Sequence, residues 1–159
     1  MATYSRQTRI DAPLESVWDF HSQISGLEAL TPSWMNLEIE SVTGPDGTTN
    51  PDVLVAGSRI KMSMRPLGIT PQQQWTSAIT ARKAGDGTAM FRDEMRGGPF
   101  STWVHTHRFF ADGTTTILHD EVRYEFPGGF LGDILSTFGV IGFEPMFRDR
   151  HQTTKKQLE

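Results

Sequence analysis

The chain has 159 residues, no cysteine, and 15 lysine and arginine residues against 19 aspartate and glutamate residues. The absence of cysteine excludes a disulfide scaffold, a thiolate metal site and a thiol nucleophile, and the net charge of −4 gives no basic surface for nucleic acid. No apolar run approaches the roughly 20 residues that span a bilayer, and the first residues lack the apolar segment of a signal peptide, so we expect one cytoplasmic domain over residues 1–159.

The order of the expected elements is a strand, two short helices, about six further strands and a long helix. Polar and apolar residues alternate over 3–11, which predicts the first strand. Pro13 marks the start of one short helix, and Pro32 ends the second. Alternating apolar residues between Gly-, Pro- and Asp-rich turns then predict an antiparallel sheet. Only residues 131–158 can cover it as a long helix, with a kink or break expected near Pro145.

The Asp112-Gly113 pair predicts a tight hairpin, because both central residues of such a turn must accept positive φ. If these two residues form the loop, His105 lies directly opposite Asp120 on the neighbouring strand. Side chains that face one another in this way share one face of the sheet, with Cβ atoms about 5 Å apart. The hairpin therefore predicts an imidazole beside a carboxylate.

A second turn, at 97–99, pairs the preceding strand with the same one. The most plausible pairing places Asp93 opposite Trp103 and Phe91 opposite His105. The two turns together predict an interior face that carries Phe91, Asp93, Met95, Trp103, His105, His107, Phe109, Leu118, Asp120, Val122, Tyr124 and Phe126. The other face carries mostly Arg, Glu and Thr, which indicates that it faces solvent.

Four ionisable side chains, Asp93, His105, His107 and Asp120, are therefore expected among aromatic residues. Unpaired, each would cost several kcal/mol to bury. They should pair with one another or be wetted by a cavity. Trp75 and Ile79 are also expected inside, which requires a loop longer than two residues at 84–87.

Several stretches in this order resemble a known family. They are Ile10-Asp11-Ala12-Pro13 with Val17-Trp18-Asp19-Phe20; Trp75 and Ile79; Phe91-Arg92-Asp93-Glu94-Met95; Gly98-Pro99-Phe100 with Trp103, His105, His107 and Phe109; Asp120-Glu121-Val122-Arg123-Tyr124; Pro127-Gly128-Gly129; and Phe147-Arg148-Asp149-Arg150. The pattern resembles the START-like, or SRPBCC, superfamily, in its prokaryotic polyketide cyclase/dehydrase-like branch. This resemblance implies an α+β helix-grip fold, with about seven strands in a curved antiparallel sheet around a long C-terminal helix and two short helices after the first strand.

The resemblance implies that a small hydrophobic or amphipathic molecule, lipid- or polyketide-like, binds in a cavity between the sheet and the last helix. Apolar side chains would form the walls, and the four ionisable groups would orient a hydroxyl or carbonyl of the ligand. The residues expected to bind it are Trp75, Ile79, Phe91, Asp93, Met95, Trp103, His105, His107, Asp120, Tyr124, Phe138 and Met146.

Two other functions stay open. One is a cyclase, aromatase or dehydratase in which His105 and Asp120 transfer a proton. The other is an interaction module with a filled interior, with a homodimer as a possible form. His105 and His107 with Asp93 or Asp120 could hold zinc or iron, but polar cavity lining explains the pattern equally well. We therefore expect no metal, no cofactor and no nucleic-acid partner.

Overall fold

The computed structural model describes the backbone of residues 1–159 and the side chains of all of them except Asp133, Leu135, Ser136, Thr137, Phe138 and Val140. Seven strands form one antiparallel sheet in the order β1-β7-β6-β5-β4-β3-β2. The strands are β1 (Ala2–Ile10), β2 (Glu38–Thr43), β3 (Arg59–Met64), β4 (Gln73–Gly85), β5 (Thr88–Gly97), β6 (Thr102–Asp112) and β7 (Thr115–Glu125). The helices are α1 (Leu14–His21), α2 (Ile24–Leu30) and α3 (Phe130–Leu158), with 3-10 turns η1 (Ser33–Met35) and η2 (Pro66–Gly68).

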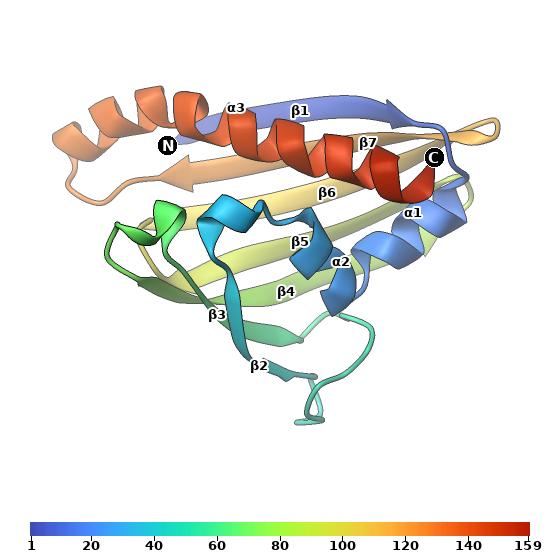
Figure 1. Ribbon diagram of the computed structural model, residues 1–159, viewed down its shortest axis with the longest axis horizontal. Coiled ribbons are helices and arrows are strands. Elements are labelled where there is room, and N and C mark those ends of the chain that lie inside the picture. Colours follow the sequence, from blue (N-terminus) through green and yellow to red (C-terminus); the bar gives the residue numbers. More distant parts are fainter.

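The sheet curves around α3, which lies along β1 and β7 (Figure 1). The edge strands β1 and β2 are consecutive in sequence, and α1 and α2 carry the chain from one edge to the other. α2 ends at Leu30, with extended backbone at Thr31 before Pro32. The predicted α+β helix-grip fold is confirmed, including the two short helices after the first strand.

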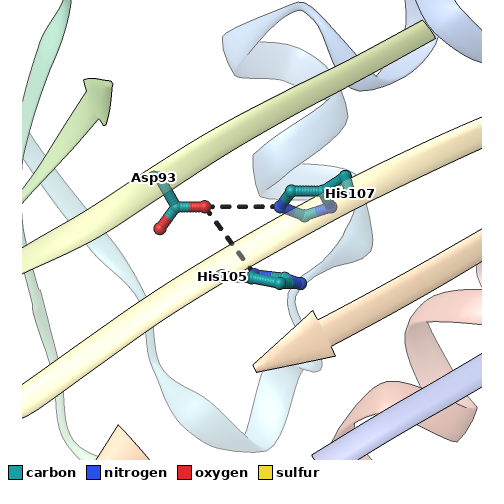
Figure 2. Close-up of side chains that lie close together, drawn as sticks. All are labelled: Asp93, His105 and His107. Carbon is teal, nitrogen blue, oxygen red and sulfur yellow. Dashed lines mark hydrogen bonds and ion pairs between the residues drawn. The ribbon is translucent and has the colours of Figure 1, made fainter. Parts of the chain in front are cut away.

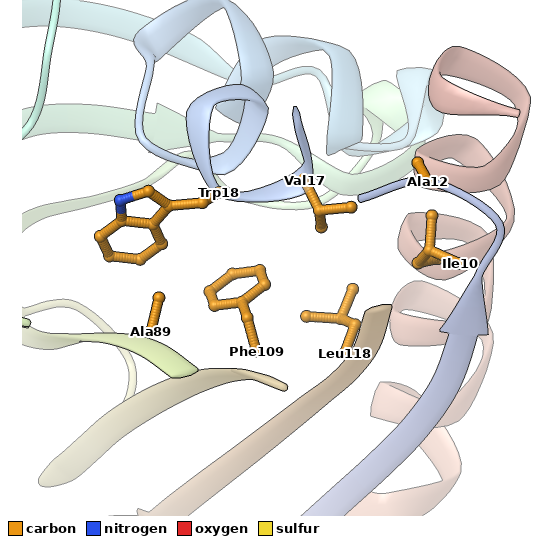
Figure 3. Close-up of a cluster of buried hydrophobic side chains, with 7 residues drawn as sticks. All are labelled: Ile10, Ala12, Val17, Trp18, Ala89, Phe109 and Leu118. Carbon is orange, nitrogen blue, oxygen red and sulfur yellow. The ribbon is translucent and has the colours of Figure 1, made fainter. Parts of the chain in front are cut away.

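The buried apolar residues form three separate clusters. One lies beneath α1, where Trp18 meets Phe109 edge-on with ring centroids 5.5 Å apart; Figure 3 shows its members, which are Ile10, Ala12, Val17, Trp18, Ala89, Phe109 and Leu118. A second cluster joins β2, β3 and β4 and consists of Val42, Leu54, Ile60, Met62 and Ile79. The third joins β1 and β7 to α3 through Tyr4, Val122, Tyr124 and Phe147. A divided core of this kind leaves room between the sheet and the helix.

The β6–β7 hairpin differs from the prediction by two residues. Its loop is Gly113-Thr114, because Asp112 pairs with Thr115 and the left-handed position (φ 62°) falls on Gly113 as the first loop residue. His107 therefore lies directly opposite Asp120, so the predicted register of His105 opposite Asp120 is wrong, although the two side chains still contact one another. A shift of two residues preserves the face of every side chain, so the predicted interior face stands.

The β5–β6 connection shows the same kind of error. β5 extends to Gly97, and the positive φ angles of Gly97 and Gly98 (76° and 82°) widen the turn. Asp93 consequently pairs with His105 and not with Trp103, and Phe91 pairs with His107. The shift is again two residues, so these side chains still share the interior face.

The longer loop expected at 84–87 is absent. Gly85 pairs with Thr88 across a two-residue Asp-Gly turn, as in a regular tight hairpin. The strand register instead shifts by one residue between Ile79 and Ala81, a β-bulge that reverses the alternation. This bulge keeps Ile79, 4% exposed, in the core.

α3 runs without a break from Phe130 to Leu158, so a break near Pro145 is wrong, while a kink there stays a prediction. Pro145 lies on the exposed side of the helix, while Phe143 and Phe147 pack against Tyr4. This packing outweighs the one backbone hydrogen bond that proline removes. Among the described residues, no helix is both long and apolar enough to cross a membrane.

Gly139 lets α3 lie close to Tyr124 of the sheet because it has no side chain. A Cβ atom at Gly139 would lie 2.6 Å from Cε2 and 2.7 Å from Oη of the fully buried Tyr124, whereas one at Gly142 would meet nothing within 4 Å. Gly139→Ala should therefore lower the free energy of unfolding by about 1–3 kcal/mol. Gly142→Ala should raise it by about 0.5–1 kcal/mol through helix propensity. Urea unfolding measures both, and equal stabilisation by the two variants would contradict the close packing.

Candidate ligand cavity and polar cluster

Three adjacent strands and α3 place five ionisable side chains together inside the protein. Asp93 comes from β5, His105 and His107 from β6, Asp120 from β7 and His151 from α3. The two strand histidines are two residues apart, so both point to the interior face. We call these five residues the polar cluster.

Asp120 lies at the centre of the polar cluster and is 1% exposed. His105 Nε2 donates to its Oδ1 at 3.0 Å, and His151 Nε2 donates to its Oδ2 at 2.6 Å. His107 Nδ1 also lies 2.7 Å from Oδ1, outside hydrogen-bond geometry. Burial opposes ionisation, but the charge of His107 and the hydrogen bonds from the imidazoles hold the pKa of Asp120 well below its usual value.

Asp93 faces the same imidazoles from the other side. His107 Nε2 donates to its Oδ1 at 3.3 Å, His105 Nδ1 lies 3.7 Å from that oxygen, and Ser77 Oγ donates to Oδ2 at 3.3 Å. Burial again opposes the charge, yet the hydrogen bond from His107 and the nearby imidazoles lower the pKa of Asp93. Both carboxylates are therefore ionised at neutral pH.

The pKa values of the two strand imidazoles shift in opposite directions. Burial, together with the charge of His107, lowers the pKa of His105 to about 4. Burial alone would do the same to His107, but Asp120 and Asp93 outweigh it and raise the pKa of His107. The ring centroids are 3.6 Å apart, so two positive charges there would repel strongly. Phe91 stacks on the other face of His107 at 3.9 Å.

A cavity of about 380 Å³ lies between the sheet and α3, with α2 and η1 on a third side. Of the residues predicted to bind a ligand, nine line it: Trp75, Ile79, Phe91, Asp93, Met95, Trp103, His105, His107 and Met146. Met62, Phe143 and Phe147 extend its apolar walls. Trp34 lines the cavity and is 41% exposed, which locates it where the cavity meets solvent.

Three of the residues predicted to bind a ligand are not among those that the structure places in the cavity wall. Asp120 and Tyr124 are absent from the cavity wall among the described residues, since both are fully buried behind it. Asp120 contacts His105 and His107, and these two residues line the cavity. The side chain of Phe138 lies outside the described residues.

Sequence reasoning missed three polar residues contributed by helices. Arg150 lines the cavity, His151 binds Asp120, and His21 of α1 lies at the cavity wall. A signal existed for the first two, because Phe143, Phe147 and the Arg150-His151 pair recur at three- and four-residue spacing and so share one face of α3. His21 follows Val17 by four residues on the buried face of α1.

The arrangement is able to hold a cation as well as a proton. One donor atom each from Asp93, His105 and His107 lies within 4.8 Å of the other two.

The cavity also presents a cationic side chain, Arg150, beside neutral and apolar groups. The site can therefore take an oxygen-bearing organic molecule, and its polar end offers both acceptors and donors.

Comparison with known proteins agrees with the fold and the cavity. Residues 1–159 match the family model for polyketide cyclase / dehydrase and lipid transport. The chain belongs to this family. Members share a fold suited to ligand binding, and the cavity of this chain is in keeping with it. No curated protein matches the chain.

Solved structures with the same fold come from distant relatives. Truncated norcoclaurine synthase from Thalictrum flavum has a TM-score of 0.67 at 16% identity, with 99% of this chain and 94% of that chain covered. A START superfamily protein from Mycobacterium smegmatis has a TM-score of 0.62 at 13% identity, covering 98% and 96%. The protein TTHA0849 from Thermus thermophilus has a TM-score of 0.63 at 17% identity, covering 98% and 95%. At these identities the likeness shows the fold alone.

His21 makes a prediction for the pH dependence of stability. Burial, followed by the charge of Arg150, lowers the pKa of His21 to about 3. The hydrogen bond from its Nδ1 to Val17 O and the charge of Asp120 raise the pKa, but burial outweighs both. The native state therefore resists a proton that the unfolded chain accepts near pH 6.5. The contribution of His21 is fully present above that pH and is lost as the pH falls toward 3, by at most about 1.4 kcal/mol per unit.

His21→Gln should consequently flatten the acid limb of the stability curve relative to the wild type. Urea unfolding at a series of pH values between neutral and acid measures the difference. His119→Gln, at a partly exposed histidine of β7, is the matched control and should leave the slope unchanged. Parallel acid limbs for the wild type and His21→Gln would contradict a neutral buried His21.

Proposed function

We propose that the protein binds a small hydrophobic or amphipathic molecule, lipid- or polyketide-like, in the cavity between the sheet and α3. The observation that carries this proposal is a cavity of about 380 Å³ whose walls are mostly apolar and carry the grouped side chains of Asp93, His105 and His107. Sites for small organic ligands have volumes of roughly 300–1,000 Å³ and combine apolar walls with a few placed polar groups. Membership of a family described by lipid transport and polyketide chemistry supports the same class of ligand.

The polar part of the cavity defines the complementary part of the ligand. Asp93, His105 and His107 supply oxygen and nitrogen atoms at the wall, and Arg150 supplies a cation. Trp75 and Trp103 offer flat apolar surfaces. A molecule with an aromatic or aliphatic body and a hydroxyl, carbonyl or carboxylate at one end satisfies both parts.

Native mass spectrometry of the full chain against a lipid and polyphenol library should detect complexes of one ligand per chain. Met146→Trp should weaken the strongest binder at least about tenfold, or 1.4 kcal/mol, because Met146 lines the cavity and a larger ring occupies ligand space. Ile141→Trp is the matched control on α3, since Ile141 is 73% exposed and does not line the cavity. Absence of any complex, or equal affinity for the two variants, would contradict the proposal.

A second candidate function is proton transfer on an enolisable ligand. It is favoured by the contact of His105 with Asp120, which fixes the ring through Nε2 and leaves Nδ1 for a molecule in the cavity. Asp120 does not line the cavity among the described residues, so it would act as a positioning residue and not as the group that touches substrate.

The test of this second function is exchange of the α-protons of an aryl ketone in D₂O, followed by NMR. The wild type should accelerate the exchange. His105→Gln should lower the exchange rate by roughly 10²–10⁴-fold. Asp120→Asn should lower the rate while the ketone still binds. Ketone binding is measured in parallel by titration. Exchange that His105→Gln leaves intact would rule out this role for His105.

A further inference from the structure

Three donor atoms in the cavity wall converge in a pattern typical of metal centres. Asp93 Oδ1 lies 3.3 Å from His107 Nε2 and 3.7 Å from His105 Nδ1. Figure 2 shows both imidazoles facing the same carboxylate oxygen across adjacent strands. In a tetrahedral site with bonds of about 2.0–2.1 Å, neighbouring donor atoms are about 3.4 Å apart. The two spacings from Asp93 Oδ1 are close to that value, and the donor atoms of all three residues lie within 4.8 Å of one another.

The other nitrogens of the same imidazoles point to a second carboxylate. His105 Nε2 lies 3.0 Å and His107 Nδ1 2.7 Å from Asp120 Oδ1. Histidines that bind metals usually direct their second nitrogen at a carboxylate or carbonyl, which fixes the ring and its tautomer. Here one buried carboxylate serves both rings, and His151 holds its other oxygen at 2.6 Å.

We propose that Asp93, His105 and His107 form a binding site for a divalent transition-metal ion, with zinc as the best match. Two imidazoles and one carboxylate suit zinc, and such three-residue sites leave a fourth position for water or another molecule. All three residues line the cavity, so that open position faces the space where a ligand would lie. The wall side chains around it are largely apolar and would limit access of water.

Charge and local packing favour the same conclusion. Asp93 and Asp120 place two carboxylates beside the same pair of imidazoles, and a divalent cation held by Asp93, His105 and His107 would balance both negative charges once His107 releases its proton. Phe91 stacks on His107 and Phe147 lies against His105, with centroids 5.1 Å apart, so packing restrains both rings.

This inference goes beyond the proposed function, because the three residues can hold a metal whether or not an organic molecule binds. The test uses the full chain without a histidine tag, stripped with a chelator and then exposed to Zn²⁺ or Co²⁺. After gel filtration, elemental analysis should find one metal ion per chain. The Co²⁺ form should show the intense visible absorption of four-coordinate cobalt. Retention of only traces of metal by the wild type would overturn the proposal.

Variants then locate the ion. Asp93→Asn, His105→Gln and His107→Gln should each weaken zinc binding at least about 100-fold, and Asp120→Asn about 10–100-fold, as expected for a ligand and for its outer partner. His119→Gln, on the other face of the sheet, should bind zinc like the wild type. Competition with a chromophoric chelator gives the affinities. Unchanged affinity in all three ligand variants would overturn the proposal.

Wild-type protein with ¹⁵N-labelled histidine keeps the question decidable if a variant does not fold. Addition of Zn²⁺ should shift the Nδ1 resonance of His105 and the Nε2 resonance of His107, while His119 stays unchanged. Shifts confined to other histidines would contradict the assignment. The ligand library is measured on the metal-free protein, so failure of the metal site and failure of the proposed ligand binding give different results.

Discussion

The structure depends on one buried carboxylate. Asp120 is 1% exposed, and removal of a carboxylate from water costs several kcal/mol unless hydrogen bonds replace the lost hydration. His105 on the neighbouring strand and His151 on α3 provide those bonds. Because the two donors belong to different layers, this carboxylate joins the helix to the sheet in the middle of the protein. The position of α3 and the form of the polar cluster are therefore coupled.

This coupling accounts for the position of the cavity's polar groups. The apolar clusters lie under α1, across β2–β4 and between β1, β7 and α3. The space between them is bounded on one side by Asp93, His105 and His107, and Asp120 lies behind both rings, hydrogen-bonded to His105 and 2.7 Å from His107 Nδ1. The divided apolar core leaves the cavity between its clusters, whereas this set of side chains gives the cavity its polar chemistry.

The sequence predicted which sheet face each strand residue occupies more accurately than it predicted which residue lies opposite on the neighbouring strand. Both hairpin registers were wrong by two residues, yet the faces survived because alternation repeats every two residues. Ile79 was correctly placed inside for a wrong reason, since a bulge and not a longer loop reverses its alternation. A bulge leaves no turn residue to mark it. His151 and Arg150 were missed because placing them requires knowing which face of α3 meets the sheet.

The same geometry bears on what the polar cluster can do. His105 has its Nε2 committed to Asp120, so only Nδ1 remains to accept a proton, a metal ion or a hydrogen bond from a ligand. These partners compete for one nitrogen, and a metal bound there would prevent direct proton transfer by His105. A bound ion would instead present its open position to the ligand's oxygen, beside the cation of Arg150. Under the two proposals, the partner that occupies Nδ1 would determine whether the cavity wall can act as a base or as a Lewis acid.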